Sequence, residues 1–520
     1  MVRIEAHALA LKGADLKQVF HGMKGSIPVK VQHSTTPKSE KCTDQKLARQ
    51  WNSIDWKAIE YQVNRSQTRI AKATKDKKWN MVKRLTYLLT HSYFAKLLSV
   101  RIVTQYRGKR TAGIDGELWT SASDKMQAAI NLSDQHYRAY PLRRIYIPKP
   151  GKTSKRPLSI PTMRDRATQA LYALGLQPVA ETTADARSFG FRLFKCAQDA
   201  SNYAFRCLWK TTSSPWILEG DIKGCFDNIS HFWLKNNIPI DKSILSQFLK
   251  SGFIFDDKFH STDIGTPQGG IISPLLANMT LDGIEKLLHE HFPKMKVHLI
   301  RYVDDFLVTT PTKEIASEVC DVIREFLAIR GLELSLEKTL ITHINNGFDF
   351  LGWRFRKYKG QLLIKPSDKS IKSISQKLKT TVSNARAWTQ DELIKKLNQI
   401  IRGWANYHRH IVAKVIFKRL DHYLWELTWH WGKRRHPNKG YKWIFNKYWS
   451  SEGSRNWVFQ TKETKLLQFS DFQIRRYSMS KLDANPYLDR SYFLERKNRI
   501  KKQTPWIQTR LPFFFSFKAV

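Results

Sequence analysis

The pattern of apolar and polar residues changes along the chain, and each pattern predicts a different kind of structure. Over residues 51–105, apolar residues recur at helical spacing, as in W-N-M-V-K-R-L-T-Y-L-L-T-H-S-Y-F-A-K-L-L (79–98). Between residues 140 and 310, short runs rich in β-branched and aromatic residues alternate with helical runs. The patterns therefore predict a helical segment followed by a region of the α+β class.

Helical spacing returns after residue 367 in three segments with short connections. The predicted apolar stripes are Ile371, Ile374, Leu378 and Val382 in the first segment, Leu393, Leu397, Ile400 and Trp404 in the second, and Ile411, Val415 and Leu420 in the third. These stripes predict a three-helix bundle over residues 366–432. Residues 1–50 are predicted to form a loose basic extension, and residues 433–520 are rich in Trp, Tyr, Lys and Arg with little regular period.

Net charge is the strongest compositional signal. The chain carries 88 Lys and Arg residues against 45 Asp and Glu residues, a formal net charge of +43. Such self-repulsion is best tolerated when a polyanion supplies the opposite charge, which indicates a nucleic-acid partner. A membrane surface is the alternative polyanion, and solubility alone does not require so one-sided a balance.

Cysteine usage and hydropathy indicate the compartment. The five cysteines are scattered without any C-x-x-C pair, which argues against a zinc module or a disulfide scaffold and suits a reducing environment. No apolar run is long enough to cross a bilayer, and the N-terminal residues lack a signal-peptide core. We therefore expect no membrane partner, no secretion, and a location in a bacterial cytoplasm or an organelle matrix.

Two adjacent acids, Asp304 and Asp305, lie between apolar runs in L-I-R-Y-V-D-D-F-L-V-T-T (299–310). Such a pair either caps a surface turn between two strands or binds divalent metal, whose charge compensates it. A third acid, Asp221, lies near the end of the strand-like run W-I-L-E-G-D-I (216–222). One acid on a strand and two at the tip of a hairpin could bring together the hard oxygen ligands that two-metal phosphoryl transfer needs.

Four sequence blocks then identify a family. They are R-R-I-Y-I-P-K-P-G-K-T-S-K-R-P-L-S-I-P-T-M-R-D-R (143–166), D-I-K-G-C-F-D (221–227), G-T-P-Q-G-G-I-I-S-P-L-L-A-N (265–278) and Y-V-D-D (302–305). In this order they resemble the reverse transcriptase encoded by group II introns. Y-x-D-D alone is a weak signal, but four blocks in sequence are specific. The resemblance implies that Asp221, Asp304 and Asp305 bind the two catalytic Mg²⁺ ions.

The resemblance also implies the architecture, a right-hand polymerase of the α+β class. The expected parts are a helical N-terminal extension at residues 51–120, fingers and palm at 121–365, a three-helix thumb (domain X) at 366–432, and a basic C-terminal region at 433–520. That last region is expected to bind DNA. Because no cysteine follows Cys320, we expect it to lack the endonuclease that many relatives carry.

Residues of a nucleotide pocket follow from the same resemblance. Lys149 and Arg156, on the basic hairpin, are expected to bind the triphosphate of a dNTP. Phe226, five residues after Asp221, is expected to exclude a ribose 2′-hydroxyl, and Gln268 to line the pocket. The glycines around Gln268 are expected to let the backbone approach the nascent base pair. The plainer alternatives are a solvated basic loop, a core phenylalanine and an ordinary loop.

Three later features have two readings each. Lys338 resembles a proton donor to the leaving pyrophosphate, but could be a surface lysine. The block F-D-F-L-G-W-R-F (348–355) resembles a hairpin that grips the primer end, although its aromatic residues could be core. In R-G-W-A-N-Y-H-R-H (402–410), Trp404 and Tyr407 could stack on unpaired bases or pack the bundle.

The chain departs from its relatives at two places. Val303 stands where relatives usually have Ala, which predicts a bulkier neighbour for the metal ions. The segment S-F-G-F-R-L-F-K-C (188–196) lacks the Pro-Gly turn that relatives have there. Since the three acids are intact, we expect polymerisation to be retained and template handling to be affected.

The expected function is RNA-directed DNA synthesis from dNTPs, combined with promotion of splicing of the host intron. The expected partners are group II intron RNA, a DNA target and an RNA template–DNA primer duplex, and a primer such as a nascent strand would be supplied from elsewhere. Two alternatives stay open: a splicing-only maturase without polymerase activity, and an intron-free reverse transcriptase used in repair or defence.

Overall fold

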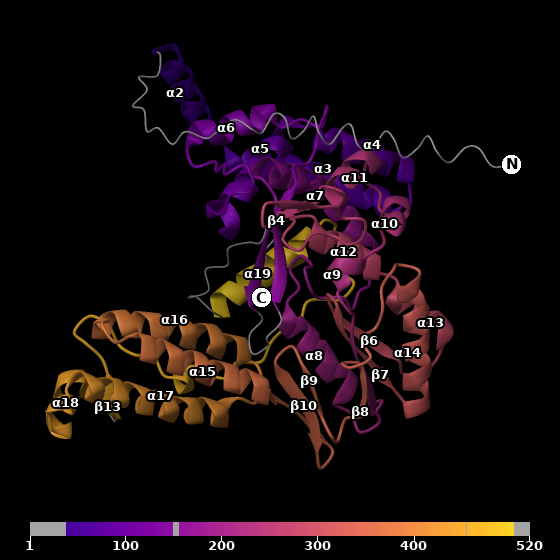
Figure 1. Ribbon diagram of the computed structural model, residues 1–520. Coiled ribbons are helices and arrows are strands. Elements are labelled where there is room, and N and C mark those ends of the chain that lie inside the picture. The colour runs from indigo at the N-terminus through magenta and orange to yellow at the C-terminus, as the bar shows by residue number, and fades with distance from the viewer. Residues whose placement is uncertain (1–37, 149–154, 454, 504–520) are drawn as a thin grey trace.

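Three regions follow one another along the chain. Figure 1 shows them as a helical layer at the top, a mixed centre and a helical arm that extends to one side. The computed structural model describes residues 38–148, 155–453 and 455–503. The mixture of helices and sheets confirms the expected α+β class. Among these residues, no helix combines the length and the apolar character that crossing a bilayer requires.

The helices of the N-terminal region share one hydrophobic core with a central helix, α7 (Met163–Thr183). They are α2 (Lys38–Asn52), α3 (Trp56–Lys75), α4 (Trp79–Thr90), α5 (Tyr93–Gln105) and α6 (Ala122–Asn131). Helix α7 is buried along almost its whole length, and its Leu174 shares a core with Ile70 and Val100. A helix covered on all sides has no polar face, so its sequence shows little amphipathic period.

Helix α2 corrects the prediction of a loose extension over residues 1–50, because residues 38–50 are helical. Of the α2 side chains that the structure describes, those from residue 43 onward, Leu47 and Trp51 join the core of this region, one helical turn apart. Two apolar residues in an otherwise polar helix give a weak periodic signal, which the sequence pattern therefore missed. Residues 1–37 lie outside the described part of the chain.

A four-stranded sheet in the order β2-β1-β4-β5 carries the basic hairpin. Strands β1 (Leu142–Pro148) and β2 (Lys155–Ile160) are antiparallel, as predicted. Strand β4 (Phe253–Phe255) runs parallel to β1, and β5 (Lys258–His260) returns antiparallel to β4. The predicted turn at residues 150–154 and Lys149 lie outside the described residues.

The second sheet is antiparallel, in the order β6-β7-β3-β8. Its strands are β3 (Trp216–Asp221), β6 (His298–Tyr302), β7 (Asp305–Thr310) and β8 (Leu340–His343). Ile217 enters a core shared with α8 (Ala197–Leu208), whereas its neighbour Leu218 enters one shared with α14 (Lys313–Ala328). Because both faces are covered, the strands are nearly continuous apolar runs.

Five further helices complete the centre, namely α9 (Cys225–Asn228), α10 (His231–Asn237), α11 (Lys242–Leu249), α12 (Ser273–Leu281) and α13 (Ile284–His291). A three-stranded sheet of β9 (Phe348–Phe350), β10 (Trp353–Tyr358) and β11 (Gln361–Pro366) leads into the arm. Phe348, Trp353 and Phe355 are buried there, so the aromatic residues of block 348–355 belong to the core.

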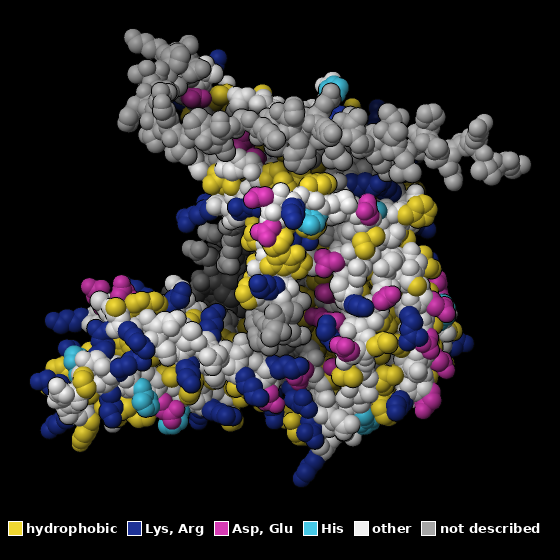
Figure 2. All heavy atoms as spheres, in the orientation of Figure 1, with side chains coloured by type: hydrophobic (Ala, Val, Ile, Leu, Met, Phe, Trp, Pro, Cys, Tyr) yellow, Lys and Arg dark blue, Asp and Glu magenta, His cyan; other side chains and the backbone are white. Residues whose placement is uncertain are grey.

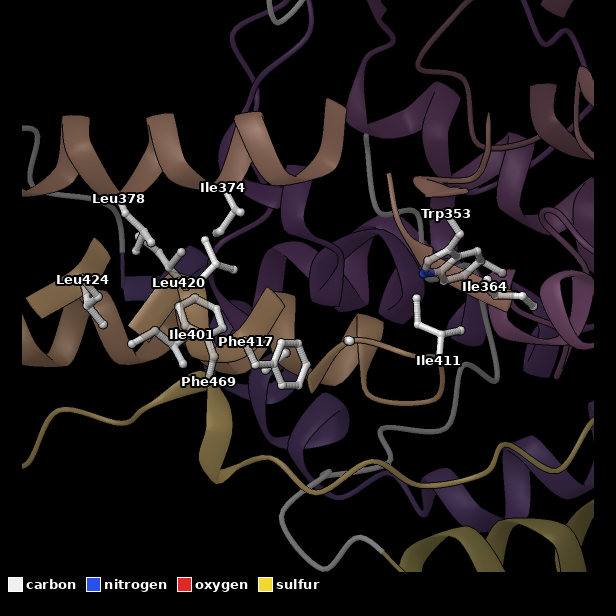
Figure 3. Close-up of a cluster of buried hydrophobic side chains, with 14 of the residues drawn as sticks. Trp353, Ile364, Ile374, Leu378, Ile401, Ile411, Phe417, Leu420, Leu424 and Phe469 are labelled. Atoms are coloured by element: carbon white, nitrogen blue, oxygen red, sulfur yellow. The ribbon is translucent and has the colours of Figure 1, made fainter. Parts of the chain in front are cut away.

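The arm is the predicted three-helix bundle, made by α15 (Asp368–Asn384), α16 (Gln390–His408) and α17 (Lys414–Arg435). Figure 3 shows Ile374 and Leu378 of α15 pointing toward α17, where Leu420 and Leu424 lie in the same cluster. Ser367 caps α15 by accepting the backbone N–H of Ser370. The apolar period and the capping residue thus agree on where α15 begins.

One position of the predicted stripes is wrong. The Val415 side chain is 81% exposed, whereas Phe417, two residues later, is fully buried. The reason is that α17 begins only at Lys414, after a connection in which Ile411 is already buried. The predicted stripe assumed one continuous helix from Ile411 to Leu420, whereas Ile411 lies in the connection before α17.

The aromatic residues of segment 402–410 pack the bundle. The Tyr407 ring stacks on Trp353 with centroids 4.7 Å apart, and its hydroxyl donates to the Leu351 carbonyl at 2.8 Å. Trp404 donates through Nε1 to Ser370 Oγ at 3.2 Å. Both side chains therefore have partners inside the protein, which favours the packing alternative.

The C-terminal region is more regular than predicted and returns from the arm to the centre. Its elements are α18 (Tyr441–Tyr448), β12 (Trp449–Glu452), β13 (Arg455–Phe459) and α19 (Arg490–Gln503). On the way back, the Tyr477 hydroxyl donates to Asp199 Oδ2 at 3.1 Å, and Phe493 stacks on Phe194 with centroids 4.7 Å apart. Segment 188–196, which lacks the Pro-Gly turn, thus contacts the C-terminal region.

Candidate active site

The three predicted acids converge at one edge of the sheet β6-β7-β3-β8. Asp221 is the last residue of β3 and lies directly opposite Asp305, the first residue of β7. Asp304 lies in the two-residue turn that joins β6 to β7, where Tyr302 and Asp305 form the last strand pair. Antiparallel pairing of β3 with β7 therefore brings Asp221 close to Asp304 and Asp305, which follow it by more than eighty residues in the sequence.

The electrostatics of the cluster follow from three negative charges in a partly desolvated place. Loss of solvent, and then the charges of Asp304 and Asp221, raise the pKa of Asp305 to about 7. Burial and the charge of Asp221 likewise raise the pKa of Asp304. The Lys338 ammonium forms an ion pair with Asp221 Oδ2, and the positive charges of Arg156 and Lys338 favour ionised Asp304.

These residues fit magnesium by their chemistry. Carboxylate oxygens are hard ligands, and a divalent cation would relieve the repulsion that raises the pKa values of Asp304 and Asp305. Across the described ranges, no three His, Cys, Asp or Glu side chains are gathered closely enough to hold a metal ion together. Asp221 pairs instead with Lys338.

The predicted pocket residues differ in how far their side chains are exposed. Arg156 lies on β2 opposite Ile147, with an exposed side chain. Phe226, on α9, is half-buried and packs partly against the neighbouring core. Lys338 has a side chain that is 53% exposed. Lys149 lies outside the described residues.

Gln268 is held by two neighbouring segments. Its carbonyl accepts from the Ser159 N–H at 2.7 Å, and its Nε2 donates to the Asp227 carboxylate at 3.0 and 3.2 Å. The glycines of this loop are also required by contacts within the protein. A Cβ on Gly265 would lie 2.4 Å from the Asp227 carbonyl, and one on Gly269 2.4 Å from the Ser159 carbonyl, so the protein's own backbone requires them.

Sequence reasoning missed two buried polar residues beneath the turn. Arg301 is fully buried and forms an ion pair with Asp282, and Asn278 is 1% exposed. Arg301 lies inside the apolar run of β6, and a charge in a strand covered on both faces is unusual. A charged residue in this apolar run was the sequence feature that could have indicated a buried polar contact here.

The two departures from the family meet at the turn. Val303 has a left-handed backbone, with φ of +62°, and its side chain is only 5% exposed. A Cβ on Gly190 would lie 2.4 Å from Val303 Cγ2. The valine side chain therefore packs against segment 188–196.

Three family models match successive parts of the chain. The N-terminal domain of reverse transcriptase matches residues 51–132, reverse transcriptase (RNA-dependent DNA polymerase) matches 147–355, and the group II intron maturase-specific domain matches 371–449. Together they follow the order of the helical region, the two sheets and the arm.

Curated relatives agree with the models. Protein YkfC of Escherichia coli (strain K12) is 31% identical over 320 residues, which cover 52% of this chain and 83% of that protein. The group II intron-encoded protein LtrA of Lactococcus lactis subsp. cremoris is 29% identical, over 58% of this chain and 66% of LtrA. Maturase-like protein 1 of Euglena gracilis is 25% identical, over 63% and 70% respectively. The chain belongs to the family of reverse transcriptases and maturases encoded by group II introns, whose activities are RNA-directed DNA synthesis and promotion of intron splicing.

Proposed function

We propose that the sheet β6-β7-β3-β8 is the palm of a right-hand polymerase, with the β2-β1-β4-β5 sheet in its fingers and the arm as its thumb. Asp221, Asp304 and Asp305 would bind two Mg²⁺ ions. The observation that carries the proposal is the register of β3 against β7, which sets Asp221 opposite Asp305 beside the turn that holds Asp304. When bound, the metal ions would supply an activated primer 3′-hydroxyl and neutralise the leaving pyrophosphate.

The chain's own residues would bind and orient the nucleotide. Arg156 of β2 and Lys149, which directly follows β1 in the sequence, would contact the triphosphate, since guanidinium and ammonium groups bind phosphate oxygens. The Phe226 ring would exclude a ribose 2′-hydroxyl. Gln268 would line the pocket in the orientation that Asp227 gives its amide. Lys338, already beside Asp221, would donate a proton to the pyrophosphate.

The arm and the C-terminal region would bind the polyanionic partners. Figure 2 shows many Lys and Arg side chains over the arm, which suits contact with the phosphates of intron RNA and of the template–primer duplex. We propose that the C-terminal region contacts the DNA target. The protein would then promote splicing and reverse splicing of the intron and copy the inserted RNA into cDNA, the retrohoming reaction.

Primer extension tests the proposal directly. The purified protein should extend a DNA primer on an RNA template only with a divalent metal. Asp304→Asn should lower the rate by about 1,000-fold, as expected for the loss of several kcal/mol of metal-ion stabilisation. Its Kd for the template–primer duplex should stay unchanged.

Asp321→Asn is the matched control, because Asp321 is an exposed acid on α14 that pairs only with the nearby Arg324. It should extend the primer at the wild-type rate. Splicing stimulation by a wild-type protein that extends no primer would overturn the polymerase assignment and favour the splicing-only alternative.

A further inference from the structure

The two-residue turn that contains Asp304 and directly precedes Asp305 has an unfavourable backbone. Val303 is its first residue and the only one of the two with positive φ, at +62°. That position in a two-residue hairpin favours glycine, because a Cβ is crowded in the left-handed region. A β-branched residue is poorly suited to it, so contacts from elsewhere must hold this turn in shape.

Arg301 supplies one such contact from beneath the turn. Its guanidinium is fully buried and donates from Nη1 to the Val303 carbonyl at 3.4 Å, the long end of hydrogen-bond distances. The same nitrogen donates to Asn278 Oδ1 at 3.3 Å, and Nη2 is paired with Asp282. A buried cation thus faces the peptide that directly precedes Asp304, where its charge favours the carbonyl pointing inward.

Asn278 connects this contact to the packing on the other side of the valine. Its Nδ2 donates to the Gly190 carbonyl at 2.9 Å, and Gly190 lies against Val303 so closely that no Cβ would fit between them. The strand itself is tied to the same segment, since Phe189 N–H donates to the Arg301 carbonyl at 2.9 Å. The turn is therefore held by a carbonyl contact below and a side-chain contact at Gly190.

We propose that Arg301 is the positioning residue of this turn, holding the Val303–Asp304 peptide so that Asp304 and Asp305 face Asp221 despite the left-handed valine. Arg301 touches no substrate and acts only through the two acids. The inference rests on the proposed roles of these acids.

The test first replaces the buried Arg301–Asp282 pair and then removes the steric penalty of positive φ at residue 303. Arg301→Met with Asp282→Asn removes the donor without leaving an unpaired buried charge. Single-turnover primer extension should slow by about 100-fold, the effect of a small misplacement of reacting groups, while the KM for dNTP stays near the wild-type value. Adding Val303→Gly should recover about tenfold, because glycine adopts positive φ without the steric penalty.

Val303→Ala in the same background is the matched comparison. It removes the same contact with Gly190 but keeps the Cβ, so it should recover less than glycine. Equal recovery by Ala and Gly would overturn the proposal, since the loss would then reflect packing and not the backbone of the turn.

An ion pair in the N-terminal region, outside segment 188–196, controls for general loss of stability. Arg101 of α5 and Glu60 of α3 form an ion pair 3.0 Å long with side chains 24% and 32% exposed. Arg101→Met with Glu60→Gln should lower the Tm but leave the extension rate near that of the wild type. If this control slows extension as much as the Arg301 pair does, Arg301 has no special role.

Hydrogen exchange of the peptide spanning residues 299–310 gives a readout that needs no activity. The variant that lacks Arg301 and Asp282 should exchange faster there than the variant that lacks Arg101 and Glu60. Equal exchange in the two variants would reject the positioning role, even if the wild-type protein polymerises. If the wild-type protein does not polymerise but the Arg301 variant still exchanges faster, only the polymerase proposal is rejected.

Discussion

In the arm, α15, α16 and α17 each turn a periodic apolar face inward, and capping residues mark where α15 and α16 begin. In the hairpin β6–β7, by contrast, adjacent acids repel each other, a valine has left-handed backbone and an arginine is buried in an apolar strand. The arm follows local rules apart from the exposed Val415, whereas the hairpin breaks several of them at once. Such violations are expected where side chains are held for chemistry and not for stability.

The largest expected effect separates activity from stability at the hairpin. Asp305→Asn should reduce primer extension by about 1,000-fold. Because the folded-state pKa of Asp305 is raised to about 7, its charge opposes folding increasingly as the pH rises from about 4 to 7. Without added metal at pH 8, the variant should therefore have a Tm equal to or above that of the wild type. A large drop in Tm would show that Asp305 stabilises the fold, and the hairpin would then not differ from the arm in this respect.

In the arm, a substitution in the core should lower stability and leave activity nearly unchanged. Leu378 is fully buried between α15 and α17, so Leu378→Ala should cost about 2–5 kcal/mol of unfolding free energy. Extension by the folded protein at low temperature should remain close to normal. Val415→Ala, on the exposed side of α17, should change the free energy of unfolding by less than about 0.5 kcal/mol. Denaturant titration measures both, and a comparable cost for Val415 would show that α17 is oriented differently.

Acid should destabilise the arm through His408. Trp353 Nε1 donates to His408 Nδ1 at 3.0 Å, so the ring must stay neutral, and burial together with the charge of His410 lowers its pKa to about 3. The unfolded state binds a proton near pH 6.5 and the folded state does not, so stability is complete above pH 6.5 and falls as the pH drops toward 3. The loss from His408 should reach about 2 kcal/mol at pH 5.

His408→Asn tests this, since Asn keeps an acceptor for Trp353 but does not titrate. Its stability should fall less between pH 7 and pH 5 than that of the wild type. The control is His422→Asn, which makes the same substitution at an exposed histidine of α17 and so reports the effect of the substitution itself. Parallel pH profiles for the wild type and His408→Asn would contradict the prediction.

The smallest effect concerns a cap. The Thr389 hydroxyl accepts from the Glu392 N–H at the start of α16, in a capping box. Thr389→Ala should cost about 1 kcal/mol, whereas Ser373→Ala, at an exposed position within α15, should cost almost nothing. Thermal unfolding distinguishes them, and equal Tm values for the two variants would mean that the cap contributes nothing.

How far the sequence predicts the structure differs between the two regions. The bundle followed from apolar periodicity, except at Val415, where one period was carried across a helix break. The strands bearing Asp221 and Asp305 were also predicted, but their pairing joins residues far apart in the chain and needed the family resemblance. No local pattern encodes such a contact.

Other parts of the site lie beyond sequence reasoning for physical reasons. The contact of Arg301 with the Val303 carbonyl, and of Gln268 with Asp227, depends on side-chain directions that folding alone decides. Glycine was expected in this loop for approach to a base pair, but the crowding of Gly265 and Gly269 by the backbone of Asp227 and Ser159 depends on tertiary contacts that the sequence does not show. Helix α2 was missed because only Leu47 and Trp51 anchor it.

The most direct test is to locate the metal ions in a complex. A crystal of the protein with template, primer and a non-hydrolysable dNTP in Mn²⁺ would reveal them by anomalous scattering. Oxygens of Asp221, Asp304 and Asp305 should lie about 2.1–2.2 Å from the ions, and Lys338 should have left Asp221. Manganese bound elsewhere, with the Lys338–Asp221 ion pair intact, would contradict the assignment of these three acids.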